Sequence, residues 1–296
     1  MEKVAGASVV VKIGGSACTH KSQFETLNEE GLNGACSQLA ALWKEGRQSG
    51  ISVAVVHGAG SFGHQQARQY AISAGADDAG GGGASMMPES KQIGFAKTRL
   101  SVTTLNKHIL TRLIDYGVPA TTLSPFPCVA TRKKSLMNAQ LPPPVVASIR
   151  GLLSRGLVPV VHGDAVLDEA QGCAILSGDV WMVELCRELG STTAVFLTDV
   201  DGVFTAPPSD PSAQLISEIL LDVASGELEL TGVSMSCDGR HDVTGGLKTK
   251  LDCAARILME AASVEVVFIV KTGSEAAAEA MRGRTPALGT ALRRKS

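Results

Sequence analysis

Residues 51–64 read Ile-Ser-Val-Ala-Val-Val-His-Gly-Ala-Gly-Ser-Phe-Gly-His, and this stretch decides the fold class. Its apolar, β-branched first part, 51–56, predicts a buried parallel strand. Three glycines follow, and because they carry no Cβ, the backbone N–H groups around them can turn toward a ligand. A helix that begins at this loop would add a partial positive charge. The stretch therefore predicts an anion site at the end of a strand.

The alternation of strand, glycine turn and helix continues on both sides of this stretch. Apolar runs predict further strands at residues 8–13, 118–123, 158–161, 193–197 and 264–270. Helical spacing predicts helices at residues 32–46, 65–70, 91–116, 145–154, 179–189 and 247–262. A β-hairpin is predicted at 166–176, around Gly172. The pattern predicts an α/β fold, with a mostly parallel open sheet sandwiched between helices.

Two further segments carry expectations of their own. The helix at 91–116 is predicted to bury a single apolar stripe, formed by Ile93, Leu100, Leu105, Ile109, Leu113 and Ile114. Residues 74–85 consist mainly of Ala, Gly and Asp, which predicts a mobile surface loop.

Charge and composition argue against several classes of protein. The 296 residues carry a formal net charge of −2 with both signs dispersed, which gives no footprint for nucleic acid. The N-terminal apolar run is too short for a signal peptide or a membrane span, so we expect a cytoplasmic protein without membrane insertion. The seven cysteines are scattered and form no Cys-x-x-Cys pair, which argues against structural zinc and a disulfide framework. A small-molecule substrate is the expectation that follows.

The glycines of the opening stretch also match a dinucleotide fingerprint. Gly58-Ala-Gly-Ser-Phe-Gly63 fits Gly-x-Gly-x-x-Gly and follows a predicted strand, so a nicotinamide or flavin enzyme is an alternative. That fingerprint also needs an acidic residue about twenty positions later, at the end of the next strand. Only Asp77 and Asp78 are near, and they lie in the glycine-rich segment. The chain also lacks Gly-Lys-Ser/Thr, and with it a Walker-type phosphate loop.

Three lysines and one aspartate favour phosphoryl transfer. Lys12 lies one residue before the end of the first strand, where a buried ammonium group needs an anionic partner. Lys21 follows the glycine turn at 14–16, and Lys250 lies on the helix predicted at 247–262. Taken alone, each of these two is more simply an ordinary solvated lysine. Together the three supply positive charge for a transferring phosphoryl group, with Asp179 available to orient them.

Six motifs, in their order and spacing, resemble the amino acid kinase superfamily. They are Lys-Ile-Gly-Gly-Ser (12–16), His-Gly-Ala-Gly-Ser-Phe-Gly-His (57–64), His-Gly-Asp (162–164), Ser-Gly-Asp (177–179), Thr-Asp-Val-Asp-Gly-Val (198–203) and Thr-Gly-Gly-Leu-x-x-Lys (244–250). Within that superfamily, the Gly-Ser-Phe-Gly-His ending, Gly-Phe-x-x-Thr-Arg (94–99) and Leu-Ser-Gly-Asp look like the isopentenyl phosphate kinase family. The resemblance covers almost the whole chain.

This resemblance implies a reaction and an architecture. The reaction is ATP-dependent conversion of isopentenyl phosphate to isopentenyl diphosphate, by direct in-line transfer, in isoprenoid precursor synthesis. The architecture is an amino acid kinase-like αβα sandwich, in which an N-terminal lobe (1–170) binds the phosphate acceptor and a C-terminal lobe (171–296) binds ATP. The resemblance also implies Mg²⁺ as a companion of ATP, and a homodimer.

The resemblance further implies roles for individual residues. Catalysis is assigned to Lys12, Lys21, His64 and Asp179. Nucleotide binding is assigned to Lys12, Gly14, Gly15, Ser16, Gly60, Asp199, Gly246 and Lys250. Binding of the substrate phosphate is assigned to Ala59, His64 and Gly163. One departure from the family pattern is Leu247, which stands where Gly-Gly-Met has methionine.

Elementary chemistry agrees with a phosphate acceptor. A phosphomonoester has a second pKa of about 6, so at neutral pH it is largely a dianionic nucleophile that needs no general base. The difficulty is to bring anions together, which fixed N–H donors and cations achieve. We therefore expect His64 to orient the acceptor phosphate, and Mg²⁺ to be held by phosphate oxygens and water. His57, His162 and Asp164 lack the spacing of a zinc site, and we expect the two histidines to serve loop packing.

Two other functions stay open from the sequence. A kinase of the same fold could phosphorylate a carboxylate, carbamate or phosphonate, and a non-catalytic nucleotide sensor could use the same scaffold. Lys12, Lys21 and Asp179 argue against the sensor, because binding alone does not need them. For the apolar tail of the substrate, the candidate residues are Phe62, Ile93, Phe95 and Leu100.

Overall fold

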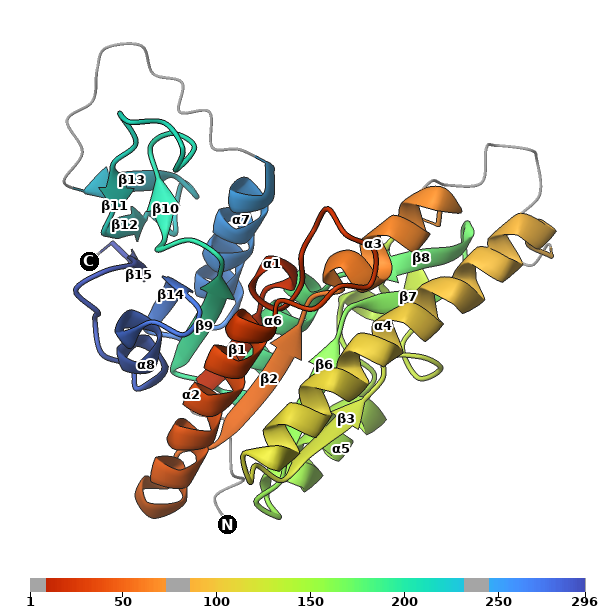
Figure 1. Ribbon diagram of the computed structural model, residues 1–296, viewed down its shortest axis with the longest axis horizontal. Helices are drawn as coiled ribbons and strands as arrows, with labels where there is room; N and C mark the ends of the chain where they lie inside the picture. The colour runs from red at the N-terminus through yellow and green to blue at the C-terminus, as the bar shows by residue number, and fades with distance from the viewer. Residues whose placement is uncertain (1–8, 73–85, 232–244, 296) are drawn as a thin grey trace.

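One nine-stranded sheet runs through the molecule in the order β13-β12-β15-β14-β9-β1-β2-β6-β3 (Figure 1). The structure is a computed structural model that describes residues 9–72, 86–231 and 245–295, without the side chains of 245–248. In the described sheet, β12–β13 and β14–β15 pair antiparallel, and the other neighbours pair parallel. The mostly parallel sheet predicted from the sequence is therefore confirmed.

The strands are short, and those at the centre of the sheet are buried. The large sheet contains β1 (Val9–Ile13), β2 (Val53–His57), β3 (Ala120–Leu123), β6 (Val158–His162), β9 (Thr193–Thr198), β12 (Glu218–Leu221), β13 (Leu228–Thr231), β14 (Val266–Lys271) and β15 (Thr290–Arg294). A second sheet contains β4 (Thr131–Arg132), β5 (Ser135–Leu136), β7 (Asp164–Asp168) and β8 (Gly172–Leu176), and a third contains β10 (Val203–Phe204) and β11 (Leu215–Ile216). The predicted hairpin is the antiparallel pair β7–β8.

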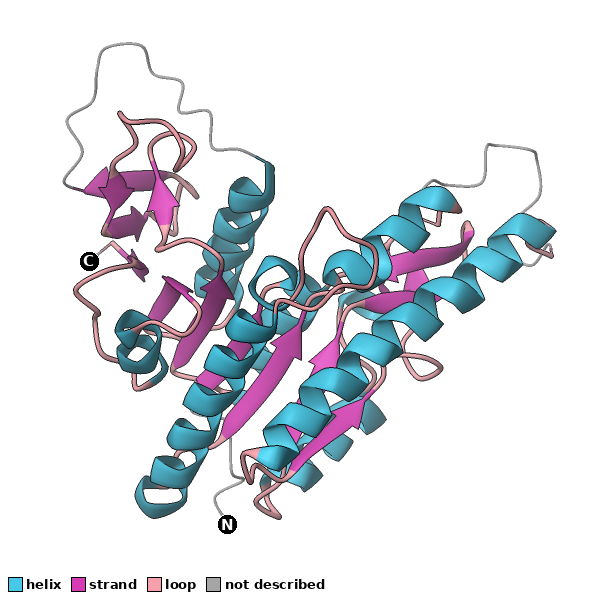
Figure 2. Cartoon of the chain, in the orientation of Figure 1, coloured by secondary structure: helices cyan, strands magenta, loops and turns pink. Residues whose placement is uncertain are grey.

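Helices cover both faces of the large sheet (Figure 2). One apolar layer lies under α2 (Glu29–Ser49), α4 (Glu89–Asp115) and α8 (Glu275–Met281). The other lies under α5 (Pro143–Leu153), α6 (Gly178–Leu189) and α7 (Gly245–Glu260). Side chains alternate along a strand, so Val9, Val11 and Ile13 of β1 face the first layer and Val10 faces the second. The αβα sandwich is thus confirmed.

Two short helices begin where central strands end. They are α1 (Gly15–Cys18), which follows β1, and α3 (Gly60–Gln69), which follows β2. The remaining helical turn is a 3-10 turn at Met137–Ala139. None of the helices in the described ranges is long and apolar enough to cross a membrane.

The bounds of α2 show how local sequence sets a helix. The Asn28 side chain accepts a hydrogen bond from Gly31 N at 3.1 Å and caps the first turn. Gly50 has a φ of +76°, a left-handed conformation that ends the helix. The helix therefore runs to Ser49, beyond the end predicted near Gly46.

The predicted apolar stripe of α4 is wrong at three of its positions. Ile93, Leu100 and Ile114 are exposed, at 47%, 69% and 55%. The buried face instead includes small or polar residues, among them Gly94, Thr98, Ser101 and Asn106. The reason is close packing, because a Cβ on Gly94 would lie 2.2 Å from Tyr70 Cβ. Simple apolar periodicity therefore misplaced the buried face.

Several other elements differ from the sequence-based expectation. The strands β12 and β13 and the helix α8 were not predicted, and α3 begins at Gly60 instead of residue 65. The predicted loop at 74–85 lies outside the described residues.

Candidate active site

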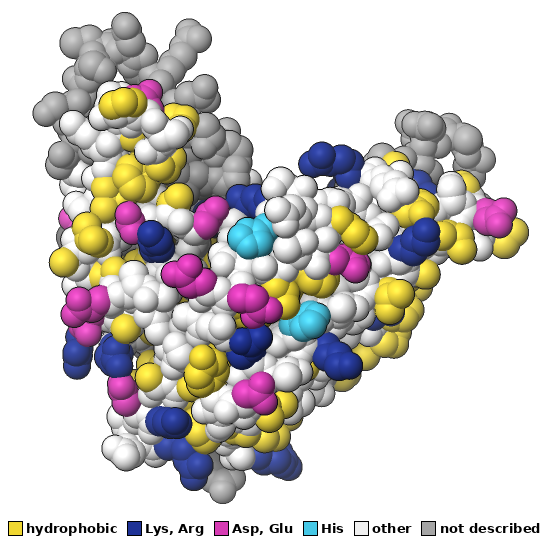
Figure 3. All heavy atoms as spheres, in the orientation of Figure 1, with side chains coloured by type: hydrophobic (Ala, Val, Ile, Leu, Met, Phe, Trp, Pro, Cys, Tyr) yellow, Lys and Arg dark blue, Asp and Glu magenta, His cyan; other side chains and the backbone are white. Residues whose placement is uncertain are grey.

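The loops that follow four neighbouring strands meet at one edge of the sheet (Figure 1). Because β9, β1, β2 and β6 run parallel, their carboxyl ends lie side by side. Backbone hydrogen bonds join the loops in a row: Gly14 N to Leu197 O at 2.9 Å, Gly58 N to Ile13 O at 3.1 Å, and Gly163 N to His57 O at 3.3 Å. The surface is hollowed beside this edge, between the parts that carry α7 and α3, and Lys, Arg and His side chains lie along the hollow (Figure 3).

Two glycine loops touch backbone to backbone at the centre of this edge. A Cβ on Gly15 would lie 2.6 Å from Gly60 Cα and 2.7 Å from Gly60 N, distances that no real side chain allows. Gly60 has a φ of +51°, and a Cβ there would lie 2.3 Å from Thr19 Oγ1. Only glycine at both positions lets the loop after β1 and the loop after β2 approach this closely.

The contact leaves backbone donors at the start of two helices. In the part of the chain that the structure describes, the N–H groups of Gly15, Ser16, Ala59 and Gly60 donate to no protein acceptor. Helix N-termini carry such free N–H groups together with a partial positive charge. The geometry therefore suits an anion at each loop, although α1 with its four residues adds little dipole of its own.

Lys12 and Asp179 form a largely buried ion pair behind the loops. Lys12 is on β1, and its Nζ contacts Asp179 Oδ1 on the first turn of α6. The Nζ also lies 5.6 Å from the centre of the Phe196 ring. Ser177 caps α6: its Oγ accepts from Asp179 N at 3.1 Å and donates to Asp179 Oδ2 at 3.2 Å. The partner that the sequence argument required for Lys12 is thus present.

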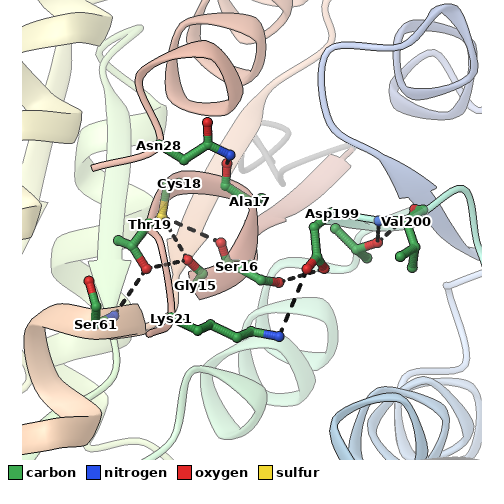
Figure 4. A network of polar contacts seen from close by, with 12 residues as sticks. Gly15, Ser16, Ala17, Cys18, Thr19, Lys21, Asn28, Ser61, Asp199 and Val200 are labelled. Carbon is green, nitrogen blue, oxygen red and sulfur yellow. Dashed lines mark hydrogen bonds and ion pairs between the residues drawn. The ribbon is translucent and has the colours of Figure 1, made fainter. Parts of the chain in front are cut away.

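Asp199 brings together two residues of the loop after β1 (Figure 4). Ser16 Oγ donates to Asp199 Oδ1 at 2.7 Å, and Lys21 Nζ lies 3.9 Å from Asp199 Oδ2. The Lys21 side chain is 68% exposed, so this pair contributes little to stability. It does keep the Lys21 ammonium group on the side of Asp199, which also binds Ser16.

Lys250 adds a third positive charge. It lies on α7, and burial, followed by the positive charges of Lys12 and Lys21, lowers its pKa, while Asp199 and Asp179 oppose that shift. Because the charges of Lys12 and Lys21 act on Lys250, the three ammonium groups lie in one region of the structure. Gly246 lies in the first turn of the same helix.

His64 lies on the first turns of α3, and part of the residue is exposed to solvent. Loss of surrounding water, followed by the positive charges of Lys21, Arg68 and Lys12, lowers its pKa. At neutral pH the ring is therefore neutral, and it can donate one hydrogen bond to an anion. The positive charges of Lys21 and Lys12 thus act on His64, which places the three side chains in one region of the structure.

Gly163 lies where the loop after β6 meets the start of α6. A Cβ there would lie 3.0 Å from Gly178 N and 3.1 Å from Leu176 O, so the position is tight. The histidines expected in loop packing are instead the last residues of buried strands, His57 on β2 and His162 on β6.

Sequence reasoning missed the hydroxyl groups that fasten the Lys21 loop. Thr19 Oγ1 donates to Gly15 O at 2.7 Å and accepts from Ser61 N at 3.0 Å. Ser61 Oγ lies 3.3 Å from Thr26 N and 3.4 Å from Thr26 O (Figure 4 shows Thr19 and Ser61). Both hydroxyl-bearing residues, Thr19 and Ser61, are buried. In the sequence, the only indication of their role is that they lie beside the glycine motifs.

Comparisons with known proteins agree with this geometry. The sequence model of the amino acid kinase family matches residues 7–270. An isopentenyl phosphate kinase of Arabidopsis thaliana is 34% identical and covers 96% of this chain and 95% of its own. One of Methanothermobacter thermautotrophicus is 32% identical over 82% of this chain and 84% of its own. A solved isopentenyl phosphate kinase structure superposes with a TM-score of 0.70 at 26% identity, over 96% of this chain and 99% of the other.

Proposed function

The chain belongs to the amino acid kinase family, and from that premise we propose that it transfers a phosphoryl group from ATP to isopentenyl phosphate. A phosphate oxygen of the acceptor attacks the γ-phosphorus, the bond to ADP breaks, and isopentenyl diphosphate forms. The acceptor loses no proton, because it enters as a dianion. The observation that carries the proposal is that the charges of Lys12, Lys21 and Lys250 act on one another at the edge of the sheet where the glycine loops leave N–H groups free.

We assign the phosphates of ATP to the side of the site that carries the lysines. Lys12 and the amides of Gly15 and Ser16 would face the β- and γ-phosphates, and Gly14, whose own N–H donates to Leu197 O, would lead the chain into this turn. Gly60 would lie beside the phosphates, and Lys21 would stabilise the transferring group. Asp179 orients Lys12, which it contacts directly. Asp199 borders the nucleotide, and Gly246 and Lys250 approach from α7.

We assign the acceptor phosphate to the loop after β2. Ala59 would donate its N–H, His64 its ring N–H, and Gly163 would leave room on the other side. We keep the proposed division into a lobe of residues 1–170 that binds the acceptor and a lobe of residues 171–296 that binds ATP, with the loop after β1 reaching the ATP phosphates from the first lobe.

Mg²⁺ fits the site as a companion of ATP. Within the described ranges, no group of three His, Cys, Asp or Glu side chains could hold a metal ion. We propose that phosphate oxygens and water would supply most of the Mg²⁺ ligands. When bound, Mg²⁺ neutralises charge on the phosphates.

The apolar tail would lie against a small cluster beside the acceptor loop. The cluster consists of Ile72, Ala165 and Cys173, with Ala67, Tyr70, Met87, Phe95 and Ile175 packed on it. Ala165 follows Gly163 by two residues, so the cluster adjoins the acceptor loops. Of the four tail residues expected from the sequence, Phe95 contacts this cluster, whereas Phe62 belongs to the main core and Ile93 and Leu100 are exposed.

The test is turnover of isopentenyl phosphate. Purified protein with ATP and Mg²⁺ should convert isopentenyl phosphate to isopentenyl diphosphate. ³¹P NMR of the reaction mixture measures this conversion. Turnover of glutamate in its place would favour the carboxylate acceptor, and ATP binding without turnover would favour the sensor. His64→Leu should raise the KM for isopentenyl phosphate and leave the KM for ATP nearly unchanged, and His64→Gln, which keeps an N–H donor, should recover part of the loss. The homodimer and the cytoplasmic location also stay predictions; light scattering checks the first.

A further inference from the structure

His57 and His162 form a buried pair beneath the acceptor loop. They end the neighbouring strands β2 and β6, and they are partners in the parallel register. Both are buried, at 0% and 1% exposure, and their rings stack with centroids 5.1 Å apart. Imidazoles withdrawn from water in this way are costly unless their ring nitrogens have partners. The proposed reaction does not use either ring directly.

Hydrogen bonds fix the tautomer of His57. Its Nδ1 lies 3.0 Å from Gly58 O, and because a carbonyl only accepts, Nδ1 carries the proton. The Nε2 atom is then an acceptor, and Asn106 of α4 supplies the donor, Nδ2, at 2.9 Å. His162 repeats the first bond, with its Nδ1 3.0 Å from Gly163 O. Each ring thus donates a hydrogen bond to the carbonyl oxygen of the next residue in the chain.

The bond from His57 sets the direction of the next backbone donor. In a trans, planar peptide group the C=O and the N–H point in opposite directions. Since Gly58 O points toward the His57 ring, the N–H of Ala59 in the same peptide group points away from it. As stated above, that N–H has no acceptor within the described parts of the chain. It is therefore a donor held in place and left free.

Charged groups around the pair have partners of their own. Asp164, next to His162, accepts from Arg99 Nε at 3.2 Å and from Ser124 Oγ at 3.5 Å, and its other oxygen accepts from Ala165 N at 2.8 Å. Burial is the main cause that lowers the pKa of both histidines, to about 3 for His57. Both rings therefore stay neutral at physiological pH.

We propose that His57 is a positioning residue for the acceptor phosphate: its Nδ1–H holds the Gly58 carbonyl inward and so aims the Ala59 N–H at the phosphate. His162 supports the ring by stacking, and Asn106 prevents it from turning over. The inference rests on the proposed function, because it takes the anion beside Ala59 to be the acceptor. According to this inference, the buried His57 contributes to substrate binding although it does not contact the substrate.

Three variants separate positioning from structural support. His57→Leu keeps an apolar side chain of moderate size but removes the donor, whereas His57→Asn places an amide N–H near the position of Nδ1. His108→Leu, on the exposed face of α4, is the matched control. We expect His57→Leu to raise the KM for isopentenyl phosphate about tenfold or more, with kcat and the KM for ATP within about twofold. His57→Asn should recover most of the loss, and His108→Leu should match the wild type.

Three results would overturn the proposal. The KM for isopentenyl phosphate could be unchanged in His57→Leu, or the KM for ATP could rise equally in that variant. His57→Asn could also fail to restore the KM for isopentenyl phosphate. If His57→Leu does not fold, ¹⁵N NMR of the wild-type imidazoles decides: we expect a proton on Nδ1 and no titration between about pH 5 and 8. A proton on Nε2 would refute the bond to Gly58.

If the wild type does not turn over isopentenyl phosphate, the proposed function fails. Binding of inorganic phosphate to the wild type and to His57→Leu, measured by calorimetry, then tests the inference: weaker binding by the variant supports it, and equal binding overturns it.

Discussion

Replacing Lys12 with methionine tests whether the buried ammonium group serves the transferring phosphoryl group. Lys12 is 8% exposed, and its Nζ contacts Asp179. Methionine preserves most of the apolar stem and removes the charge. Loss of one fixed donor that stabilises charge in the transition state costs about 3–4 kcal/mol, so kcat should fall about 10²- to 10³-fold. Steady-state kinetics at saturating ATP and acceptor measure this.

The effect on the fold should be smaller than the effect on catalysis. Asp179 keeps the hydrogen bond from Ser177 Oγ at 3.2 Å, and its side chain is 23% exposed, so water replaces part of the lost pairing. A fully buried pair that loses one partner costs about 3–5 kcal/mol, and for this half-buried carboxylate we expect about 1–2 kcal/mol in the free energy of unfolding. Urea denaturation measures it. Lys107→Met on the exposed face of α4 is the control.

Two results would refute this reasoning. A folded Lys12→Met variant with kcat within about threefold of the wild type would show that the charge has no part in transfer. The double variant Lys12→Met/Asp179→Asn tests the role of the partner. If Asp179 acts by orienting Lys12, its removal adds little once Lys12 is gone, whereas additive losses would show that Asp179 acts by itself.

Three further predictions follow from the geometry. Gly15→Ala, whose Cβ would meet Gly60 Cα at 2.6 Å, should raise the KM for both ATP and acceptor in steady-state assays; a rise in only one would contradict the shared contact. Ser61→Ala should free the Lys21 loop and lower kcat several-fold with the KM for ATP nearly unchanged, while the exposed Ser37→Ala should have no effect. The folded pKa of His57 is about 3 against an ordinary 6.5, so the folded state binds fewer protons and stability is lost as pH falls below 6.5. Between pH 7 and 5 this amounts to about 2 kcal/mol in urea denaturation, and His57→Asn should remove that part of the slope.

The centre of the fold was predictable because its strands are mainly apolar runs, and glycine directly follows β1, β2 and β6. β1, β2, β6 and β9 lie within two residues of the predicted bounds, since burial on both faces leaves one reading for such runs. At the edge of the sheet that signal fades. β12 has only half of its residues buried, and its alternation over four residues is too short to predict a strand. The need of Lys12 for an anionic partner was also predictable, because a lysine in a buried strand is costly without one. The contact with Asp179 was harder to predict, because the two residues are 167 positions apart along the chain.

Other parts of the site follow from contacts that no local pattern reveals. The hydroxyl of Ser61 reads as one more small residue in a glycine-rich loop until Thr26 is brought beside it. His57 and His162 are separated by 105 positions, and only the parallel register of β2 and β6 stacks their rings. The exposed Ile93 and Leu100 show that apolar spacing alone does not identify the buried face of a helix. The buried face of α4 carries small and polar residues, which allow its neighbours to approach closely.

The carboxylates nearest the proposed transfer site also bear on which acceptor it suits. Asp179 contacts Lys12, and Asp199 accepts from Ser16 and lies near Lys21, so both are engaged on the side assigned to ATP. Neither is available as a general base, which a hydroxyl acceptor would require and a phosphate dianion does not. A carboxylate acceptor needs no base either, so the distinction between the two lies in charge. The free N–H group of Ala59 and a neutral His64 offer two donors to one anion, and a phosphate with two charges and three oxygens gains more from them than a carboxylate.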